Sequence, residues 1–228
     1  MNTSSPEKSK ATYALSRLIG RITRKNQIIQ FGIPRSGSTL VFNVLREIFP
    51  DKRLKKTHSL SSKDLKYPII ASYRHPLDVM ASLLQCQNLK VNDAEIKKQL
   101  FLLYKNGILD ILEFKDRPNV LLLRYERFSN DFDYLFSEIE KFFEIQIPGQ
   151  LRASLQSTYN IHNVKTSINS DLDFSYHDKK TLLHGRHISK FEGKVYYYKE
   201  FFSHNQIDYL AKNLAFFMDE MGYEINKN

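Results

Sequence analysis

The chain has 228 residues, 42% of them hydrophobic and 26% charged, which is the composition of one folded domain with a substantial core. Its 34 Lys and Arg residues exceed its 25 Asp and Glu residues, and the net charge of +9 favours an anionic ligand or partner, although a solvated basic surface explains the same excess. The single cysteine, Cys86, excludes an intrachain disulfide, and no apolar run approaches the roughly 20 residues of a membrane span. We therefore expect a cytoplasmic protein.

The first 25 residues form a basic segment ahead of the predicted domain. Residues 1–10 are polar, which predicts disorder, and residues 11–25 carry three arginines in a helical pattern. We interpret that pattern as a solvated helix, with contact to a membrane surface as the alternative. No long apolar stretch follows a basic start, so we expect no secretory signal. Residues 26–228 are expected to fold as a single domain.

A glycine-bearing loop follows the first predicted strand. The apolar run Gln27–Gly32 indicates a strand, and apolar residues recur at helical spacing over Ser38–Phe49. Between them stands Gly32-Ile33-Pro34-Arg35-Ser36-Gly37-Ser38-Thr39, which has the G-x-x-x-x-G spacing of a nucleotide-binding loop. Ser38 replaces the Lys that contacts the terminal phosphates of a nucleoside triphosphate in such loops. The sequence therefore predicts a site for one tetrahedral anion at a helix N-terminus, with a tight glycine turn as the alternative.

Lys56-Thr57-His58 stands where the next strand candidate, Arg53–His58, ends. Ligands of parallel α/β sheets bind outside the carboxyl ends of the strands. A histidine in that position is placed to act as a general base at neutral pH, and a solvated or structural histidine is the alternative.

A second candidate anion site follows the strand predicted over Tyr67–Tyr73. Arg74 ends this strand, and Ser82 lies two turns into a helix predicted over Leu77–Gln87. Both side chains can face the crevice that the other strand ends share. Asp78 lies one turn before Ser82, and it either orients a neighbour or is solvated.

The next elements complete an α/β pattern. Apolar residues at helical spacing predict one helix over Asp93–Phe114, and the apolar run Val120–Arg124 is typical of a buried parallel strand. Tyr125 follows that strand and offers a ring on which a purine can stack, with a core tyrosine as the alternative. Strands that alternate with helices predict a central parallel sheet flanked by helices, like that of the P-loop nucleotide enzymes.

The C-terminal half is predicted to be mostly helical. Helices are expected over Asp131–Phe143 and Gln150–Asn163, and a capping box at Ser203 opens a last helix that stops near Gly222. Between them, Thr166–Phe202 has little periodicity and many His, Lys and Tyr residues. A long irregular stretch in a compact domain is often a binding loop.

Four motifs in this order resemble those of the sulfotransferases that use 3′-phosphoadenosine 5′-phosphosulfate (PAPS). Pro34–Thr39 resembles the family's 5′-phosphosulfate loop, and Lys56-Thr57-His58 resembles its K-T-H segment. Arg74–Ser82 matches the pattern R-x-P-x-D-V-x-x-S, and Tyr125-Glu126 matches the start of Y-E-D. The resemblance is strong over about residues 27–130 and looser beyond, where His187-Ile188-Ser189 and Glu192-Gly193-Lys194 look like the family's closing loop.

The resemblance implies an enzyme that transfers a sulfuryl group from PAPS to a hydroxyl or amine and releases adenosine 3′,5′-bisphosphate (PAP), with no metal ion. It implies a catalytic base at His58, assisted by Lys56 and Arg35. The donor-binding residues that it implies are Arg35, Ser36, Gly37, Ser38, Thr39, Leu40, Arg74, Ser82, Tyr125 and Arg186. Lys190 and Lys194 are further candidates in the closing loop.

The acceptor is expected to be a small molecule or a carbohydrate, bound by loops over Asn88–Asp93 and Thr166–Phe202.

Two departures from the family pattern bear on the site. Arg127 replaces the usual Asp after Tyr125-Glu126, and the chain has no Trp for the closing loop. A P-loop kinase-like enzyme and a basic nucleic-acid-binding protein are the alternative functions. The missing loop Lys argues against the first, and the ordered strand-end residues argue against the second, so we expect no nucleic-acid partner.

Overall fold

The structure is a computed structural model that describes residues 26–168 and 177–224. The basic segment expected over residues 1–25 lies outside the described residues. In the part of the chain that is described, no helix has the length and apolarity needed to cross a bilayer.

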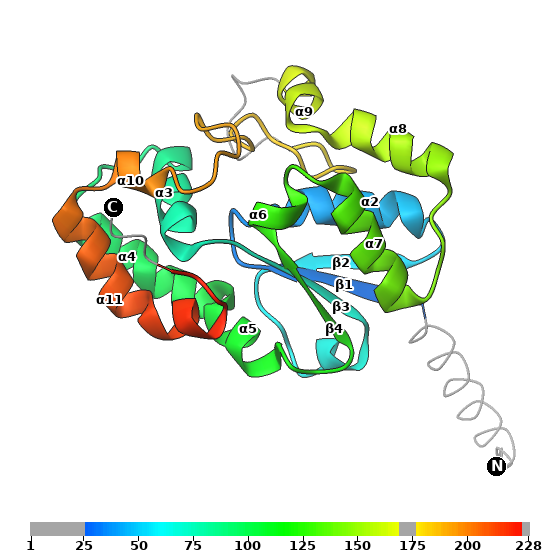
Figure 1. The fold of residues 1–228 in the computed structure, drawn as a ribbon, viewed down its shortest axis with the longest axis horizontal. Coiled ribbons are helices and arrows are strands. Elements are labelled where there is room, and N and C mark those ends of the chain that lie inside the picture. The colour runs from blue at the N-terminus through cyan, green and yellow to red at the C-terminus, as the bar shows by residue number, and fades with distance from the viewer. Residues whose placement is uncertain (1–25, 169–176, 225–228) are drawn as a thin grey trace, which may run out of the picture.

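Four parallel strands form the central sheet in the order β2-β1-β3-β4 (Figure 1). They are β1 (Gln27–Gly32), β2 (Arg53–Thr57), β3 (Ile69–Tyr73) and β4 (Val120–Arg124). Each strand was predicted within two residues of its observed bounds, and the parallel α/β fold is confirmed. The crossovers place all four carboxyl ends at one edge.

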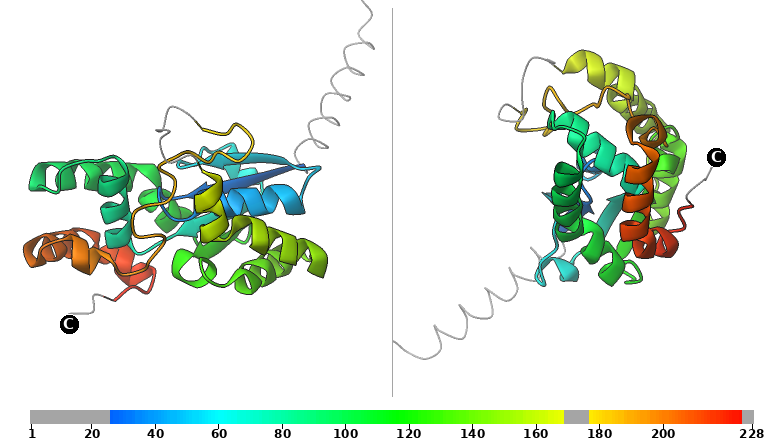
Figure 2. Two further views of the ribbon diagram at one scale, coloured as in Figure 1. Left: turned by 90° about the horizontal axis from the view of Figure 1, so that it is seen from above. Right: turned by 90° about the vertical axis from the view of Figure 1, so that its left-hand side faces the viewer.

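Neighbouring residues along the strands enter different hydrophobic cores, because successive side chains point to opposite faces of a sheet. Ile28 and Ile70 pack with α2 (Ser38–Ile48), α7 (Phe132–Phe143) and α8 (Gly149–Tyr159). Ile29 and Ile69 pack with α3 (Pro76–Cys86), α4 (Asp93–Leu103) and α11 (His204–Glu220). The first helix group lies at one end of the molecule and the second at the other (Figures 1 and 2).

The prediction of a single helix over Asp93–Phe114 is wrong. After α4, the turn η2 (Tyr104–Ile108) contains non-helical backbone, and α5 (Leu109–Phe114) follows. Gly107 has φ 126°, and a Cβ there would lie 2.8 Å from Cγ2 of Ile33, next to the glycine-bearing loop. The helix breaks because its backbone must pass close to the chain that leaves β1.

The helix predicted over Gln150–Asn163 also divides. It ends at Tyr159, and α9 (Ile161–Ser167) begins after Asn160, whose side chain caps it by accepting a hydrogen bond of 2.9 Å from the N–H of Asn163. The shorter elements are η1 (Asp64–Lys66), α6 (Tyr125–Phe128) and α10 (Tyr198–Phe201).

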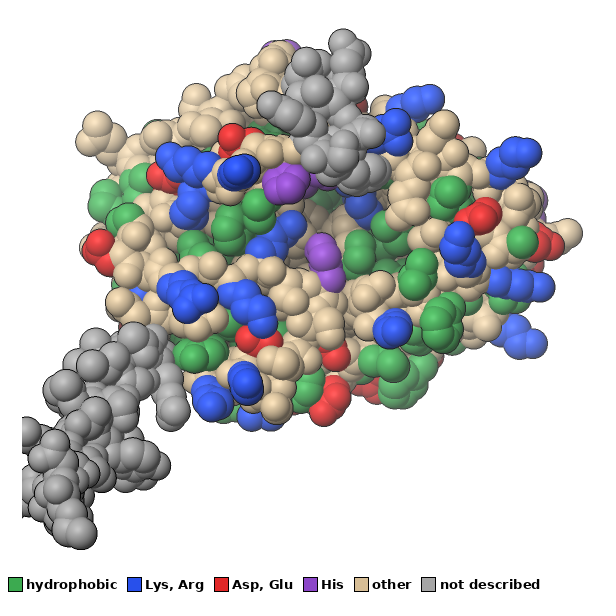
Figure 3. All heavy atoms as spheres, turned by 180° about the vertical axis from the view of Figure 1, so that it is seen from behind, with side chains coloured by type: hydrophobic (Ala, Val, Ile, Leu, Met, Phe, Trp, Pro, Cys, Tyr) green, Lys and Arg blue, Asp and Glu red, His purple; other side chains and the backbone are tan. Residues whose placement is uncertain are grey.

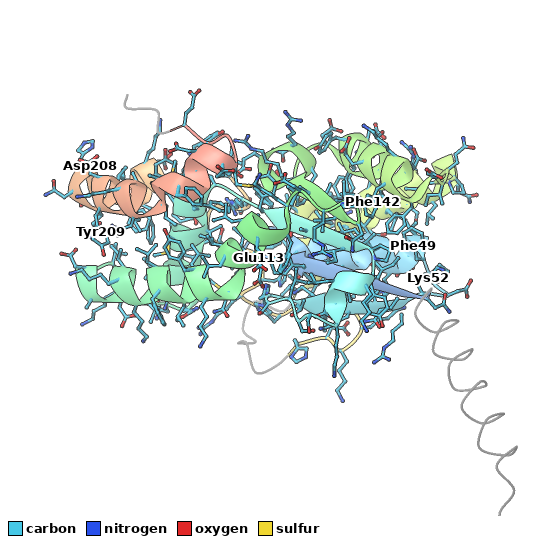
Figure 4. The ribbon with its side chains drawn as sticks, turned by 90° about the horizontal axis from the view of Figure 1, so that it is seen from below. Phe49, Lys52, Glu113, Phe142, Asp208 and Tyr209 are labelled. Carbon is cyan, nitrogen blue, oxygen red and sulfur yellow. The ribbon has the colours of Figure 1, made fainter. Side chains whose placement is uncertain are left out.

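The last helix begins at the predicted capping box, in which Ser203 and Gln206 satisfy each other's backbone N–H groups. The buried stripe of α11 runs through Leu210, Leu214 and Phe217. Figure 4 shows Tyr209 between α11 and α4, where Nζ of Lys97 lies 6.0 Å from the centre of its ring. Of the irregular stretch predicted over Thr166–Phe202, the described residues 177–197 are irregular, whereas α9 runs to Ser167 and Tyr198–Phe201 forms the short helix α10. Residues 169–176 of this stretch lie outside the described residues.

Candidate active site

The carboxyl ends of the four strands meet at one cavity of about 380 Å³. The loop after β1, His58 after β2, Arg74 after β3 and Tyr125 after β4 all line it. This convergence confirms that the separate motifs belong to one place, as the parallel sheet requires. Loop residues from the C-terminal half, including His184 and His187, form the remaining wall.

The loop after β1 presents the N-terminus of α2 to the cavity. Gly37 caps the helix with a φ of 75°, and the first turn carries no acidic residue. Ser38, Thr39 and Leu40 line the cavity, so the unpaired N–H groups of the first turn and the helix dipole favour an anion there. Ser36 is fully buried instead, and its hydroxyl lies 2.9 Å from that of Ser72, which ties the loop to β3.

Arg35 joins three parts of the site. Its Nε donates a hydrogen bond of 2.9 Å to the hydroxyl of Ser82 on α3, and its Nη2 donates one of 2.9 Å to the carbonyl of His187. The loop after β1, the helix after β3 and residues 177–198, called the C-terminal segment below, therefore meet at one guanidinium group.

Arg74 is almost completely buried and also binds the C-terminal segment. Its Nη2 donates a hydrogen bond of 2.8 Å to the carbonyl of Lys194, and its guanidinium carbon lies 4.3 Å from the centre of the Tyr125 ring. The Tyr125 hydroxyl donates to the carbonyl of Gly193. One face of the ring predicted to stack on a purine is thus covered by Arg74.

Asp78 is fully buried and fixes the same segment. It accepts hydrogen bonds of 2.6 and 3.1 Å from the backbone N–H groups of Tyr196 and Tyr198, and it lies 3.7 Å from Nη2 of Arg74. Burial raises its pKa to about 6, against the opposing effect of Arg74. Of the two interpretations offered from sequence, the structure supports the first: Asp78 orients its neighbours and is not solvated.

His58 and Lys56 face the cavity from the edge strand β2. Nδ1 of His58 lies 2.6 Å from the carbonyl of Gly32, so this nitrogen carries the proton and Nε2 is left as the basic atom. Burial lowers the pKa of His58, the Gly32 carbonyl raises it, and Lys56 lowers it further. Burial and the charge of Arg35 lower the pKa of Lys56 to about 8.

Two further histidines line the cavity: His187, which belongs to the predicted closing loop, and His184, which the sequence interpretation did not single out. The rings of His184 and His187 are 4.9 Å apart. Burial, Arg35 and then Lys56 lower the pKa of His184 to about 4, and burial and Arg35 lower that of His187 well below its usual value. Their spacing of three residues within an irregular, His-rich stretch was the available signal.

Asn43 is a further unpredicted part of the wall. It is buried on α2, and its Nδ2 donates hydrogen bonds of 2.9 Å to the carbonyls of Thr39 and Thr181. It thereby attaches the irregular segment to α2.

The three cationic candidates of the closing loop are not brought to this cavity. Arg186 and Lys190 line a neighbouring cavity, and Nζ of Lys194 is 2.5 Å from a carboxylate oxygen of Glu200. The other predicted site residues, apart from Ser36, all line the first cavity.

The described lining of the first cavity is cationic. Arg35, Lys56 and Arg74 line it with three histidines, and none of the described residues on its wall is acidic. Besides burial, the charge of Arg35 contributes to lowering the pKa values of Lys56, His184 and His187, and an anionic ligand would relieve that repulsion. Figure 3 shows His and Lys or Arg side chains around a hollow on one face of the molecule. The described residues contain no group of three His, Cys, Asp or Glu that could hold a metal ion.

Comparison with known proteins places this site in context. Residues 49–221 match the family described as the sulfotransferase domain. No curated protein sequence matches the chain. Among solved structures, mouse sulfotransferase SULT7A1 complexed with PAP is similar, with a TM-score of 0.68 and 18% identity over 89% of each chain. Retinol dehydratase with androsterone and PAP has a TM-score of 0.64 and 15% identity over 90% of this chain and 84% of that one. Retinol dehydratase with retinol and PAP has a TM-score of 0.62 and 14% identity over the same shares.

Proposed function

This chain belongs to the sulfotransferase family, and on that premise we propose that it transfers a sulfuryl group from PAPS to an acceptor hydroxyl or amine and releases PAP. The observation that carries the proposal is the cavity at the strand ends, which has three cationic side chains, a helix N-terminus and no acidic residue on its described wall. The similar structures were solved with PAP, which supports the same donor here.

The residues present fit such a donor. The N-terminus of α2 with Arg35 and Lys56 would hold the 5′-phosphosulfate, and Arg74 with Ser82 would hold the 3′-phosphate. Nδ1 of His187 is buried on this wall without a hydrogen-bond partner, and a donor oxygen would supply one. Because Arg35 bonds to Ser82 in this structure, a bound 3′-phosphate would compete with it for that hydroxyl.

The chain's own groups supply the proton transfer. Nε2 of His58 takes the proton of the acceptor while the new bond to sulfur forms and the bond from sulfur to the 5′-phosphate oxygen breaks. The Gly32 carbonyl keeps Nδ1 protonated and so directs the basic nitrogen into the cavity. Lys56 and Arg35 stabilise the charge that develops on the sulfuryl and leaving phosphate oxygens, which is the electrostatic part of the catalysis.

The test is to titrate the protein with PAP and follow its melting temperature, with and without Mg²⁺, and with AMP as the matched control. A ligand that binds the folded state raises the melting temperature by mass action. We expect a rise with PAP that needs no metal, a much smaller rise with AMP, and sulfuryl transfer from PAPS in an acceptor screen. A rise only with ATP and Mg²⁺ would reject the proposal in favour of a kinase-like enzyme.

A further inference from the structure

The turn that follows His58 is bonded to a helix far along the chain. The backbone N–H of Leu60, two residues after His58, donates a hydrogen bond of 2.7 Å to Oδ2 of Asp110 in the first turn of α5. His58 lines the first cavity, and Asp110 does not. The carboxylate of Asp110 can therefore act on chemistry in that cavity only through the residues that it holds.

The break before α5 brings the same part of the chain against the hydrogen-bond partner of His58. Nδ1 of His58 lies 2.6 Å from the carbonyl oxygen of Gly32. The next residue, Ile33, is so close to Gly107 in η2 that a Cβ on Gly107 would lie 3.2 Å from Cα of Ile33. The stretch η2–α5 thus contacts the chain just after each of the two residues that form this hydrogen bond.

Further hydrogen bonds of the turn lie within it. The hydroxyl of Thr57 donates one of 2.6 Å to the carbonyl of Ser59. The carboxylate of Asp64 accepts one of 2.9 Å from the N–H of Ser61 and one of 2.7 Å from its hydroxyl. These local bonds give the turn its shape, whereas the bond from Leu60 to Asp110 holds the turn against a separate helix.

We propose that Asp110 is a positioning residue for His58: by holding Leu60, it keeps Nδ1 of the imidazole on the Gly32 carbonyl and Nε2 directed into the cavity. The inference rests on the proposed sulfuryl transfer, in which Nε2 of His58 takes the proton of the acceptor. The competing explanation is that the charge of Asp110 only stabilises α5, as acidic residues in the first turn of a helix do.

Four variants separate these explanations. D110A removes the acceptor of the Leu60 N–H together with the charge. D110N removes the charge as well, but its amide oxygen can still accept the hydrogen bond. D116A is the control, because it removes an exposed acid just after α5 whose carboxylate pairs with Lys115. D110E keeps the charge but moves the carboxylate by one methylene, and it takes the place of D110A if that variant does not fold.

The deciding measurement is the tautomer of the His58 ring, which needs no acceptor. It is read by ¹⁵N NMR of protein labelled in its histidines, and H58Q assigns the signal. We expect Nδ1–H in the wild type, because this nitrogen faces a carbonyl. In D110A we expect part of the ring to convert to Nε2–H, and D110N and D116A should keep the wild-type tautomer.

The second measurement compares turnover with donor affinity. We expect D110A to lower the turnover of PAPS with 4-methylphenol about tenfold, because a misplaced catalytic group slows the reaction. The dissociation constant of PAP should stay unchanged, since Asp110 lies outside the cavity wall. D110N and D116A should keep most of the turnover.

A wild-type tautomer in D110A and D110E would overturn the proposal. A tautomer that changes as much in D110N as in D110A would overturn it too, because the effect would then belong to the charge at the start of α5. So would a loss of PAP affinity in D110A as large as its loss of turnover, which would indicate a general structural role. A changed tautomer with unchanged turnover would uphold the positioning and instead reject His58 as the base of the proposed function.

Discussion

Gly37 and Tyr125 are packed so closely that a Cβ on Gly37 would lie 2.8 Å from Cδ2 of Tyr125. The same Cβ would lie 2.9 Å from Cζ of Phe128. The N-terminus of α2 therefore rests directly on the aromatic residues that follow β4. The loop after the first strand and the turn after the last one form a single packed unit.

The substitution Gly37→Ala tests this packing. The added methyl group must push the loop away from Tyr125 and Phe128, and alanine also disfavours the φ of 75°. We expect a loss of about 1–3 kcal/mol in the free energy of unfolding, with a large loss of PAP affinity. The control is Gly222→Ala. Gly222 also has a positive φ, of 65°, but there is open space where a Cβ would lie. Equal effects of the two substitutions would show that the contact with Tyr125 and Phe128 does not matter.

The pH dependence of kcat/KM should have two limbs. The acid limb rises as His58 loses its proton, and it lies below the usual pKa of histidine because burial lowers the pKa of His58. The alkaline limb falls near pH 8, because Lys56 loses its charge above its pKa of about 8. The profile is measured with PAPS at concentrations well below KM, so that it reports the free enzyme.

Two variants assign these limbs. Lys56→Arg should remove the alkaline limb, because arginine stays protonated over the whole range. His58→Gln should lower kcat by about 10²–10⁴-fold and remove the acid limb, with little change in PAP affinity. An acid limb that persists in His58→Gln would assign it to another group, such as Asp78 with its pKa of about 6.

Replacing Arg74 with Lys should distinguish the contribution of the 3′-phosphate of PAP to binding from that of its 5′-phosphate. Lysine keeps the charge but loses the planar fork, and we expect it to weaken PAP binding by roughly tenfold, about 1.4 kcal/mol. AMP lacks the 3′-phosphate, so its weak binding should change little. The measurement is the dissociation constant of each ligand, together with the melting temperature of the variant. An equal loss for PAP and AMP would argue against the 3′-phosphate assignment.

Asp78→Asn tests how the C-terminal segment is held in place. The asparagine oxygen accepts one of the two backbone hydrogen bonds from Tyr196 and Tyr198, but its amide group cannot accept the other. We expect about 1–3 kcal/mol less stability and weaker PAP binding, because Arg74 bonds to the same segment at Lys194. The control is Asp208→Asn on the exposed side of α11 (Figure 4). A variant with unchanged melting temperature and PAP affinity would show that Asp78 does not hold the segment.

Most of the fold was predictable from local patterns. The strands appear as apolar runs, the last helix begins at its capping box, and the chain alternates strand with helix. A parallel sheet places all strand ends at one edge, so the meeting of Arg35, His58 and Arg74 in one cavity also followed from sequence. These features depend on residues within a few positions of each other, or on a topology that has few alternatives.

Tertiary contacts decided the rest. The break at Gly107 exists because the chain passes Ile33, and the burial of Asp78 exists because residues more than 115 positions later pack on it. Arg186 and His187 are adjacent in sequence, but His187 lines the cavity at the strand ends and Arg186 lines the neighbouring one. Contacts of residues 186–190 with Gln85 and Cys86 at the end of α3 hold this stretch in place. Local sequence carries no periodic signal in an irregular segment. The direction of each side chain there is set by distant parts of the chain, and only the folded structure could place Arg186 in the neighbouring cavity.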